Sequence, residues 1–143
     1  KTFSQKPADV TRKWYVIDAS VTPLGRLASA VAMLLNGKGK VTRTPHVDGG
    51  DYVIIINAAQ TVVTGAKAAD KKYYHYSGYP GGLSERTFTE QMERDPAKVI
   101  EKAVYGMLPV NKLRDGKMAR LKIYPGAEHT HAPQQPVTYE VKK

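Results

Sequence analysis

Cysteine is absent from all 143 residues. This absence excludes disulfide scaffolds, thiolate zinc sites and cysteine nucleophiles, and it favours a reducing compartment. Long hydrophobic runs are missing too, since the longest nearly apolar stretch, Leu27 to Leu35, is about half of the roughly 20 residues that a membrane-spanning helix needs. Residues 1–10 lack the apolar stretch of a secretory signal. We therefore expect a cytoplasmic protein without a membrane partner.

Acidic side chains are few relative to basic ones. The chain has 13 Asp and Glu against 22 Lys and Arg, which gives a formal net charge of +9. A charge of this size favours a large anionic partner such as a nucleic acid. Because 41% of the residues are hydrophobic, the chain also has the material for a folded core, and its length is typical of one domain.

A strand, a helix and a buried strand are predicted in the first 57 residues. The β-branched and aromatic segment Trp14–Asp18 predicts a strand. Apolar residues then recur at helical spacing from Leu24 to Leu35, after Pro23 and before a stop at Gly37. The continuous apolar run in 51–57 is typical of a strand buried on both faces of a parallel sheet. Together these segments predict a βαβ unit.

The rest of the chain predicts further alternating elements. We expect a short strand at 61–64, a polar loop at 66–72, a helix from Ser84 through Met92, a helix starting at Asp95 and ending at Pro109, a helix within 112–120, and a strand at 121–124. The three prolines from Pro125 onward predict an extended arm that needs a surface to lie on. The expected organisation is an N-terminal arm, 1–13, one α/β domain, 14–124, and a C-terminal arm, 125–143.

The sequence contains no complete motif for catalysis or cofactor binding. The glycines around Lys38 lack the spacing of a dinucleotide-binding or P-loop motif and follow a helix instead of a strand, so we expect no nucleotide cofactor. His129 and His131 have the residue types of a metal site but no fixed geometry, and we expect no metal. Asp48 and Asp51 could form a carboxylate pair for acid–base chemistry, but a glycine turn explains them better.

Cations interleaved with flat side chains form the most informative pattern. Basic side chains can neutralise phosphates, while Tyr and His offer faces for unpaired bases. Three groups are candidates for RNA binding, with two histidines of the arm added as stacking or hydrogen-bonding groups: Lys38, Lys40, Arg43 and His46; Lys71, Lys72, Tyr74 and His75; Lys112, Arg114, Lys117, Arg120 and Lys122; and His129 and His131.

Several ordered motifs resemble one family. These are Leu24-Gly25-Arg26-Leu27-Ala28, Gly37-Lys38-x-Lys40, Pro45-His46-Val47-Asp48-x-Gly50-Asp51-Tyr52-Val53-Ile54, Tyr73-Tyr74-His75, Gly78-x-x-Gly81-Gly82, Gly106-Met107-Leu108-Pro109, Leu121-Lys122-Ile123-Tyr124-x-Gly126, Glu128-His129-x-His131 and Gln134-Gln135-Pro136. In this order they resemble the bacterial large-subunit ribosomal protein family called L-thirteen. The resemblance extends from about Trp14 to Pro136.

This resemblance implies a fold and a function. The fold would be a three-layer α/β structure, in which helices flank a mainly parallel central sheet of about four strands, with extended N- and C-terminal arms. The protein would bind large-subunit ribosomal RNA directly, join the particle early in assembly, lie beside other ribosomal proteins, and have no catalytic activity or small-molecule substrate. Two alternatives stay open: a small α/β enzyme acting on RNA or on a phosphorylated metabolite, and a free-standing nucleic-acid-binding regulator.

Overall fold

A four-stranded parallel sheet organises the computed structural model, which describes residues 1–142. The strand order is β5–β2–β1–β6, and each neighbouring pair is parallel. The strands are β1 (Trp14–Asp18), β2 (Tyr52–Ile56), β5 (Leu121–Ile123) and β6 (Val137–Thr138). The predicted strands at 14–18, 51–57 and 121–124 are thus confirmed. The two central strands are β1 and β2, joined by the predicted βαβ crossover.

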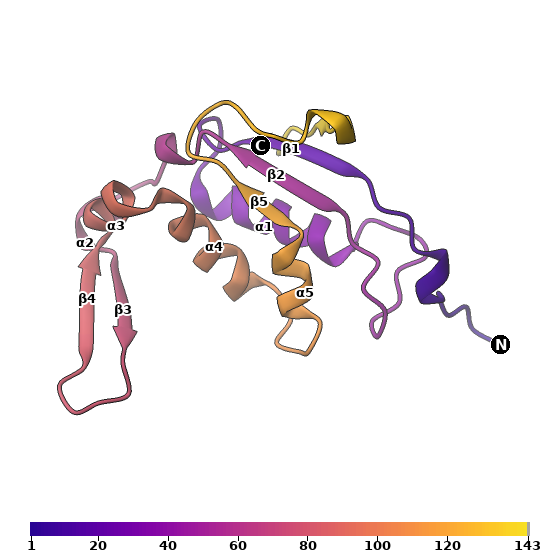
Figure 1. Ribbon diagram of the computed structural model, residues 1–143, viewed down its shortest axis with the longest axis horizontal. Helices are drawn as coiled ribbons and strands as arrows, with labels where there is room; N and C mark the ends of the chain where they lie inside the picture. Colours follow the sequence, from indigo (N-terminus) through magenta and orange to yellow (C-terminus); the bar gives the residue numbers. More distant parts are fainter. Residues whose placement is uncertain (143) are drawn as a thin grey trace.

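The main core lies between one face of this sheet and the helices (Figure 1). Helix α1 (Leu24–Asn36) packs against α4 (Pro96–Met107), and α5 (Arg114–Ala119) contacts both of them. Alternate strand residues point to opposite faces, so Ile17, Val53 and Ile55 meet the apolar sides of α1 and α4. Both helices and the shorter α5 occur where the sequence predicts them.

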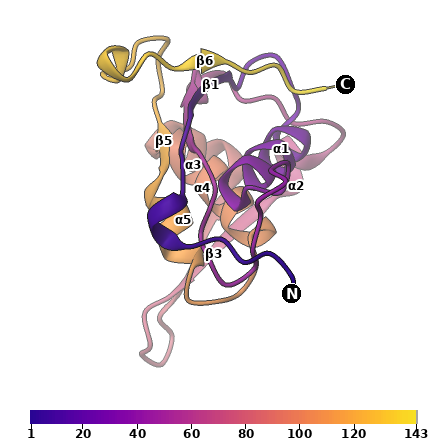
Figure 2. The same ribbon diagram turned by 90° about the vertical axis from the view of Figure 1, so that its right-hand side faces the viewer.

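The C-terminal segment covers part of the other face of the sheet. Trp14 stacks on Tyr52 there, with ring centroids 4.2 Å apart, and His131 lies 5.1 Å from the Trp14 ring. The segment includes a short 3-10 helix, η3 (Ala132–Gln134), before β6 pairs with β1 (Figure 2). The layer on this face is therefore an irregular segment, whereas the long helices lie on the opposite face.

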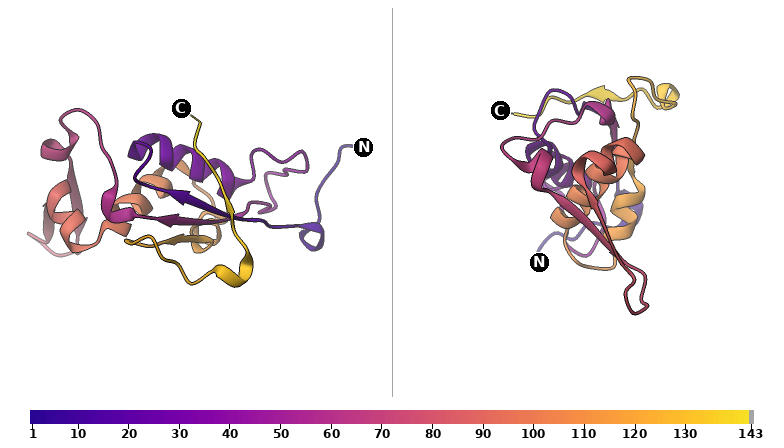
Figure 3. Two further views of the ribbon diagram at one scale, coloured as in Figure 1. Left: turned by 90° about the horizontal axis from the view of Figure 1, so that it is seen from above. Right: turned by 90° about the vertical axis from the view of Figure 1, so that its left-hand side faces the viewer.

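A two-stranded hairpin projects from the body at the end opposite the N-terminus (Figure 1; Figure 3, right). Strand β3 (Lys72–Tyr76) pairs antiparallel with β4 (Leu83–Thr87). The base of the hairpin is held by α2 (Lys67–Asp70) and α3 (Phe88–Arg94). Two further 3-10 helices are η1 (Pro7–Asp9) and η2 (Ala58–Gln60).

Three predicted elements differ from the structure. Residues 61–64 form only a single bridge, between Val62 and Pro23, so the fourth strand comes from the C-terminal segment. The predicted polar loop at 66–72 contains the helical turn α2. The helix predicted from Ser84 begins only at Phe88, because 83–87 pair with β3. Since most of this hairpin is solvent-exposed, its strands carry no apolar alternation that could reveal them.

Candidate nucleic-acid interface

The connection from α1 to β2, residues 37–51, carries the first predicted cation group. Gly37 ends α1 in the left-handed conformation with φ +68°, and its backbone N–H donates to the carbonyl oxygen of Leu34. The connection then returns to the end of α1, where Asp51 N–H donates to the same carbonyl. At Gly50 the approach is so close that a Cβ atom would lie 1.8 Å from the Leu35 carbonyl oxygen. This packing gives the connection a defined path.

An internal network of charges holds the 37–51 connection to the sheet. The Lys40 ammonium lies 2.8 Å from Asp51 and donates at 2.7 Å to the carbonyl oxygens of Thr11 and Gly49. The Arg12 guanidinium donates to the carbonyl oxygens of Gly50 and Asp48. Lys40 is thus fully occupied by contacts within the protein.

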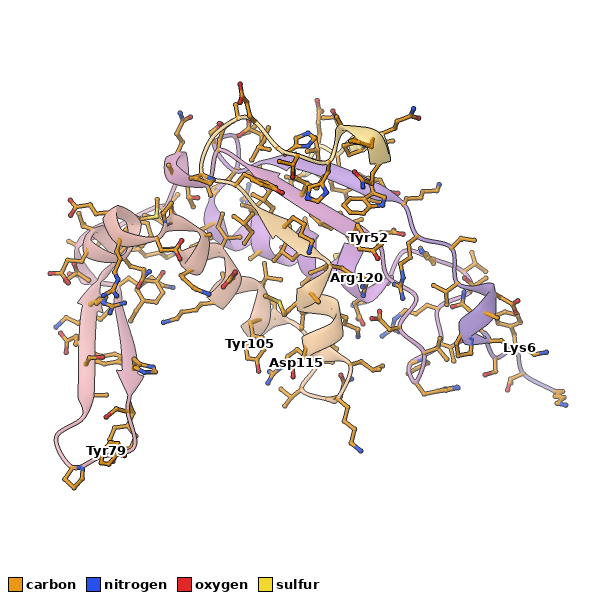
Figure 4. The ribbon with its side chains drawn as sticks, in the orientation of Figure 1. Lys6, Tyr52, Tyr79, Tyr105, Asp115 and Arg120 are labelled. Carbon is orange, nitrogen blue, oxygen red and sulfur yellow. The ribbon has the colours of Figure 1, made fainter. Side chains whose placement is uncertain are left out.

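Arg120 completes this network from the end of α5. The residue is 6% exposed, and its guanidinium donates to the carbonyl oxygens of Asp51 and Leu35 at 2.9 Å and to the Asp48 carboxylate. Figure 4 shows Arg120 between the helices and the sheet end that carries Tyr52. Asp48 and Asp51 therefore serve as ion-pair partners within the protein. This structural role fits the interpretation of the segment as a glycine turn better than that of a carboxylate pair for acid–base chemistry.

Lys117 is also turned inward. It is 3% exposed, and its ammonium donates to the side-chain oxygen of Asn36 at 2.7 Å. Burial lowers the pKa of Lys117 below its ordinary value, although the nearby Asp48 carboxylate acts in the opposite direction. Lys117 and Arg120 are therefore buried where the sequence predicts RNA contacts, and their contacts link α1, α5 and the 37–51 connection.

The other members of the first group face solvent. Lys38 and Arg43 are exposed, and among the described residues neither side chain has a hydrogen bond or an ion pair. His46 is exposed as well, with its Nε2 atom 3.5 Å from the hydroxyl of Ser4. Two cations and one imidazole of this group are therefore available to a partner.

The second group lies on the projecting hairpin. Lys71, Lys72, Tyr74 and His75 are all exposed. Lys72 lies 2.6 Å from Glu85 on the neighbouring strand, a pair that solvent surrounds. Glu85 raises the pKa of Lys72 through a hydrogen bond and its charge.

The hairpin also exposes aromatic groups that the prediction did not list. Tyr76 lies on the same face as Tyr74, and Tyr79 at the tip is 75% exposed (Figure 4). Tyr73, by contrast, is buried at the hairpin base with the ammonium groups of Lys71 and Lys102 near its ring. The interleaved pattern in the sequence therefore separates into one anchoring tyrosine and several exposed ones.

The rest of the third group lies around α5. Lys112 is exposed just before the helix, and Lys122 is half-buried on β5; neither has an ion pair among the described residues. Arg114 stacks on Tyr105, with 3.7 Å from its guanidinium carbon to the ring centroid, and donates to the Tyr105 hydroxyl. The predicted cluster of five is thus divided between surface and interior.

The two histidines of the C-terminal segment pack against the sheet. His131 makes a 2.8 Å hydrogen bond with the Tyr124 hydroxyl, and its backbone N–H donates to the His129 ring. Both histidines are half-buried. These contacts hold the segment against the protein's own sheet, which gives the predicted C-terminal arm a surface to lie on.

Residues 1–142 were also compared with the side-chain arrangements that bind metals and with helices that cross membranes. No group of three or more His, Asp or Glu side chains in this range is arranged to hold a metal ion. None of the described helices is long and apolar enough to cross a membrane. Arg12, which sequence reasoning missed, turns out to join the charge network; no local signal marks it, because its partners lie 36 and 38 residues further along the chain.

Comparison with known proteins identifies similar chains. A family model described as "Ribosomal protein L13" matches residues 12–130. The protein of Polaromonas sp. named "Large ribosomal subunit protein uL13" is 55% identical over 141 residues, covering 99% of this chain and 99% of that protein. Proteins of the same name from Laribacter hongkongensis and Kineococcus radiotolerans are 55% and 52% identical over 141 residues, covering 99% of this chain and 99% and 96% of theirs. These relatives are named as ribosomal proteins, in agreement with the expectation of a protein that is not an enzyme.

Proposed function

Because this chain belongs to the ribosomal protein L13 family, we propose that it is a structural constituent of the large ribosomal subunit and binds the RNA of that subunit directly. The names of the relatives describe them as proteins of the large ribosomal subunit. The bacterial ribosome works in the cytoplasm, which is where we expect this protein to act, next to other large-subunit proteins.

The observation that carries RNA binding is the division of the cations into two sets. Lys40 and Arg120 pair with the protein's own aspartates, and Lys117 is bound to Asn36. A second set has no intramolecular ion pair among the described residues: Lys38 and Arg43 are exposed in the 37–51 connection, Lys71 is exposed at the base of the hairpin, Lys112 is exposed before α5, and Lys122 is half-buried on β5. Cations left unpaired around a rigid body suit a polyanion whose strands converge on it.

The exposed flat side chains support RNA over DNA or a simple polyanion. Tyr74 and His75 lie on the hairpin beside Lys71, and His46 lies in the connection that holds Lys38 and Arg43. Unpaired bases of folded RNA stack on such groups, while phosphates meet the neighbouring cations. We place these side chains, together with the unpaired cations and the solvent-exposed Lys72, in the interface.

Early entry into assembly is part of the proposal. The protein has its own apolar core, and its C-terminal segment folds back on β1 through β6. A chain that reaches this form alone can bind bare RNA before neighbouring proteins are present. Its scaffold would then hold the cations at fixed positions where RNA segments meet.

Sedimentation of the native protein tests the proposal. We expect the protein to migrate with large ribosomal subunits at low salt and to be released progressively as salt increases, because counterion release drives phosphate contacts. A variant carrying Lys38→Gln, Arg43→Gln and Lys112→Gln should be released at lower salt. Failure of the native protein to migrate with the large subunit at any salt concentration would overturn the assignment.

A further inference from the structure

A cleft opens between the C-terminal ends of α1 and α4. It has a volume of about 550 Å³ and is lined by Ser29, Ala32, Met33, Asn36, Lys38, Arg43, Met107 and Pro109. Met33 is 53% exposed and Met107 is 47% exposed, although each lies on a helix that packs into the core. The cleft thus has an apolar lining that the fold itself leaves uncovered.

The charge of the cleft is of one sign. Lys38 and Arg43 are its only ionisable lining residues, and neither has an ion pair among the described residues. A second cleft, between α4 and α5, is lined by Glu101 and Asp115 as well as lysines, and there Lys98 already pairs with Glu101. Of these two clefts, the one at the ends of α1 and α4 is therefore complementary to an anion.

Asn36 supplies the cleft with a hydrogen-bond donor, and a contact with the buried Lys117 fixes the orientation of its side chain. The buried Lys117 ammonium can only donate, so its 2.7 Å contact assigns the oxygen of the Asn36 side chain to that bond. The Asn36 amide nitrogen is left as a donor, and it has no intramolecular acceptor among the described residues. Purine and pyrimidine edges carry ring-nitrogen and carbonyl acceptors that such a donor can meet.

An unstacked nucleotide requires apolar contacts for the face of its base, cations for its phosphates and a hydrogen-bond partner for the edge of its base. Methionine side chains are polarisable and adapt to an aromatic face, and the cations can meet the flanking phosphates. A base within a duplex is stacked on both sides, so its faces are not available to the methionines of the cleft. The absence of carboxylates argues against a basic peptide as the occupant.

From this we infer that the cleft between the ends of α1 and α4 binds a single unstacked nucleotide of ribosomal RNA, with Met33 and Met107 against the base and Lys38 and Arg43 on the phosphates. Lys117 acts as a positioning residue through Asn36. The inference rests on the proposed function and adds to it a site for one extruded base, beyond general charge neutralisation.

Methionine methyl groups provide the test, because the chain has four methionines and only two line the cleft. In the full chain labelled with ¹³C at the methionine methyls, we expect a five-nucleotide single-stranded RNA to shift the NMR signals of Met33 and Met107 upfield, owing to the ring current of the base. The signals of Met92 and Met118 should stay in place. A blunt RNA duplex of the same composition should leave all four signals unchanged.

Charge variants add a second test. Lys38→Gln combined with Arg43→Gln should weaken binding of the oligonucleotide roughly tenfold at low salt. Lys67→Gln, which removes an exposed charge from α2, should change it less than twofold. Binding without a shift at Met33 and Met107, an equal shift with the duplex, or equal losses in both variants would overturn the inference.

The site and the proposed function fail separately. If the native protein migrates with large subunits while the methyl signals stay silent, the cleft inference is wrong and the ribosomal assignment stands. If the oligonucleotide shifts the two methyl signals but the protein never migrates with the subunit, the ribosomal assignment is wrong.

Discussion

Two residues that pack against the end of α1, Gly50 and Arg120, determine how the 37–51 connection is held. Gly50 lies against the carbonyl oxygen of Leu35, and the same carbonyl accepts from Arg120. A charged side chain can remain in this interior because an aspartate and two backbone carbonyls accept hydrogen bonds from its two terminal nitrogens, Nη1 and Nη2. The close approach and the buried guanidinium therefore depend on each other.

Gly50→Ala should destabilise the protein by about 2–4 kcal/mol, because the new Cβ would meet the Leu35 carbonyl oxygen at 1.8 Å and the Arg120 guanidinium at 2.8 Å. Urea unfolding followed by circular dichroism measures the loss. Gly39→Ala is the control, since nothing lies within 4 Å of a Cβ at that position. Equal stability of the two variants would contradict the close packing at Gly50.

Tyr73→Phe should stabilise the protein by about 1 kcal/mol at neutral pH, because the buried Tyr73 hydroxyl has no hydrogen-bond partner among the described residues. Burial also raises the pKa of Tyr73 above its ordinary value, so the unfolded chain releases this proton first as pH rises. Stability that depends on the neutral phenol is thus present below about pH 10 and is lost above it.

The two predictions for Tyr73 are checked by the same measurement. Urea unfolding at pH 7 and at pH 10.5 should show a larger advantage of the Phe variant at the higher pH. Tyr74→Phe, which removes an exposed hydroxyl on the same strand, is the control and should give no gain in stability at pH 7. An advantage of Tyr73→Phe that stays constant with pH would contradict the raised pKa.

At the scale of elements, local signals predict α4 well. Asp95 precedes Pro96, and the Asp95 carboxylate accepts from the backbone N–H of Ala97 at 3.1 Å. Val99, Ile100 and Val104 then recur on one side and are fully buried, as expected from their spacing. Met107 departs from this pattern, since it is half-exposed at the edge of the proposed nucleotide cleft.

Asp95→Ala should lower the free energy of unfolding by about 1 kcal/mol through loss of the N-terminal cap of α4. Thermal unfolding monitored by circular dichroism provides the measurement. Asp70→Ala removes the same charge from the short helix α2, where the carboxylate caps nothing, and should cost less than about 0.5 kcal/mol. If both variants lose the same stability, the effect is one of net charge and not of capping.

The edge strand β6 depends on aromatic contacts as well as on backbone pairing. The Tyr139 backbone N–H donates to the Val16 carbonyl oxygen at 2.9 Å, and the Tyr139 ring lies edge-on to Tyr15. On the other face of the sheet, Trp14 stacks between Tyr52 and the C-terminal segment at His131. A two-residue strand pairing on one side offers few hydrogen bonds, so these rings supply much of its attachment.

Trp14→Ala should therefore loosen the C-terminal segment selectively and cost roughly 2 kcal/mol or more. In hydrogen exchange, the amide of Tyr139 should lose protection, whereas the amide of Val53, which pairs with β5, should keep it. Phe3→Ala, at an exposed ring near the N-terminus, is the matched control. Equal loss of protection at both amides would indicate global destabilisation and contradict the selective effect.

At the scale of the whole molecule, the charges that make up the net charge of +9 are divided unevenly between the interior and the surface. Asp48 forms ion pairs with Arg12 and Arg120, and Asp51 forms one with Lys40. The hairpin, the 37–51 connection and the turn before α5 then present cations at separate places on the surface (Figure 1). A partner that contacts all three must be large, as folded RNA is.

The triple variant Lys38→Gln, Arg43→Gln and Lys112→Gln should reduce the salt dependence of binding to large-subunit RNA. Each lost phosphate contact lowers the slope of log K against log salt by about 0.7–0.9, so the slope should fall by roughly 2–3. Filter binding at several salt concentrations measures it. Lys98→Gln, whose ammonium already pairs with Glu101, should leave the slope nearly unchanged; an unchanged slope in the triple variant would remove these three cations from the interface.

The sequence by itself determined what depends on neighbours along the chain. Apolar spacing and caps predict β1, α1, β2 and α4, and the excess of basic residues predicts an anionic partner. The ordered motifs predict the family, which the comparisons confirm. In each case the signal lies within a few residues or in the composition of the whole chain.

Only the tertiary structure decided which cations face outward and where the fourth strand comes from. Lys112 and Lys117 lie five residues apart with the same chemistry, yet one is exposed and the other is bound to Asn36, 81 residues away. Arg120 is bound to Leu35 across 85 residues, and β6 reaches β1 from the far end of the chain. The burial of a long charged side chain and the pairing of an edge strand depend on contacts between distant segments, and these exist only once the chain has folded.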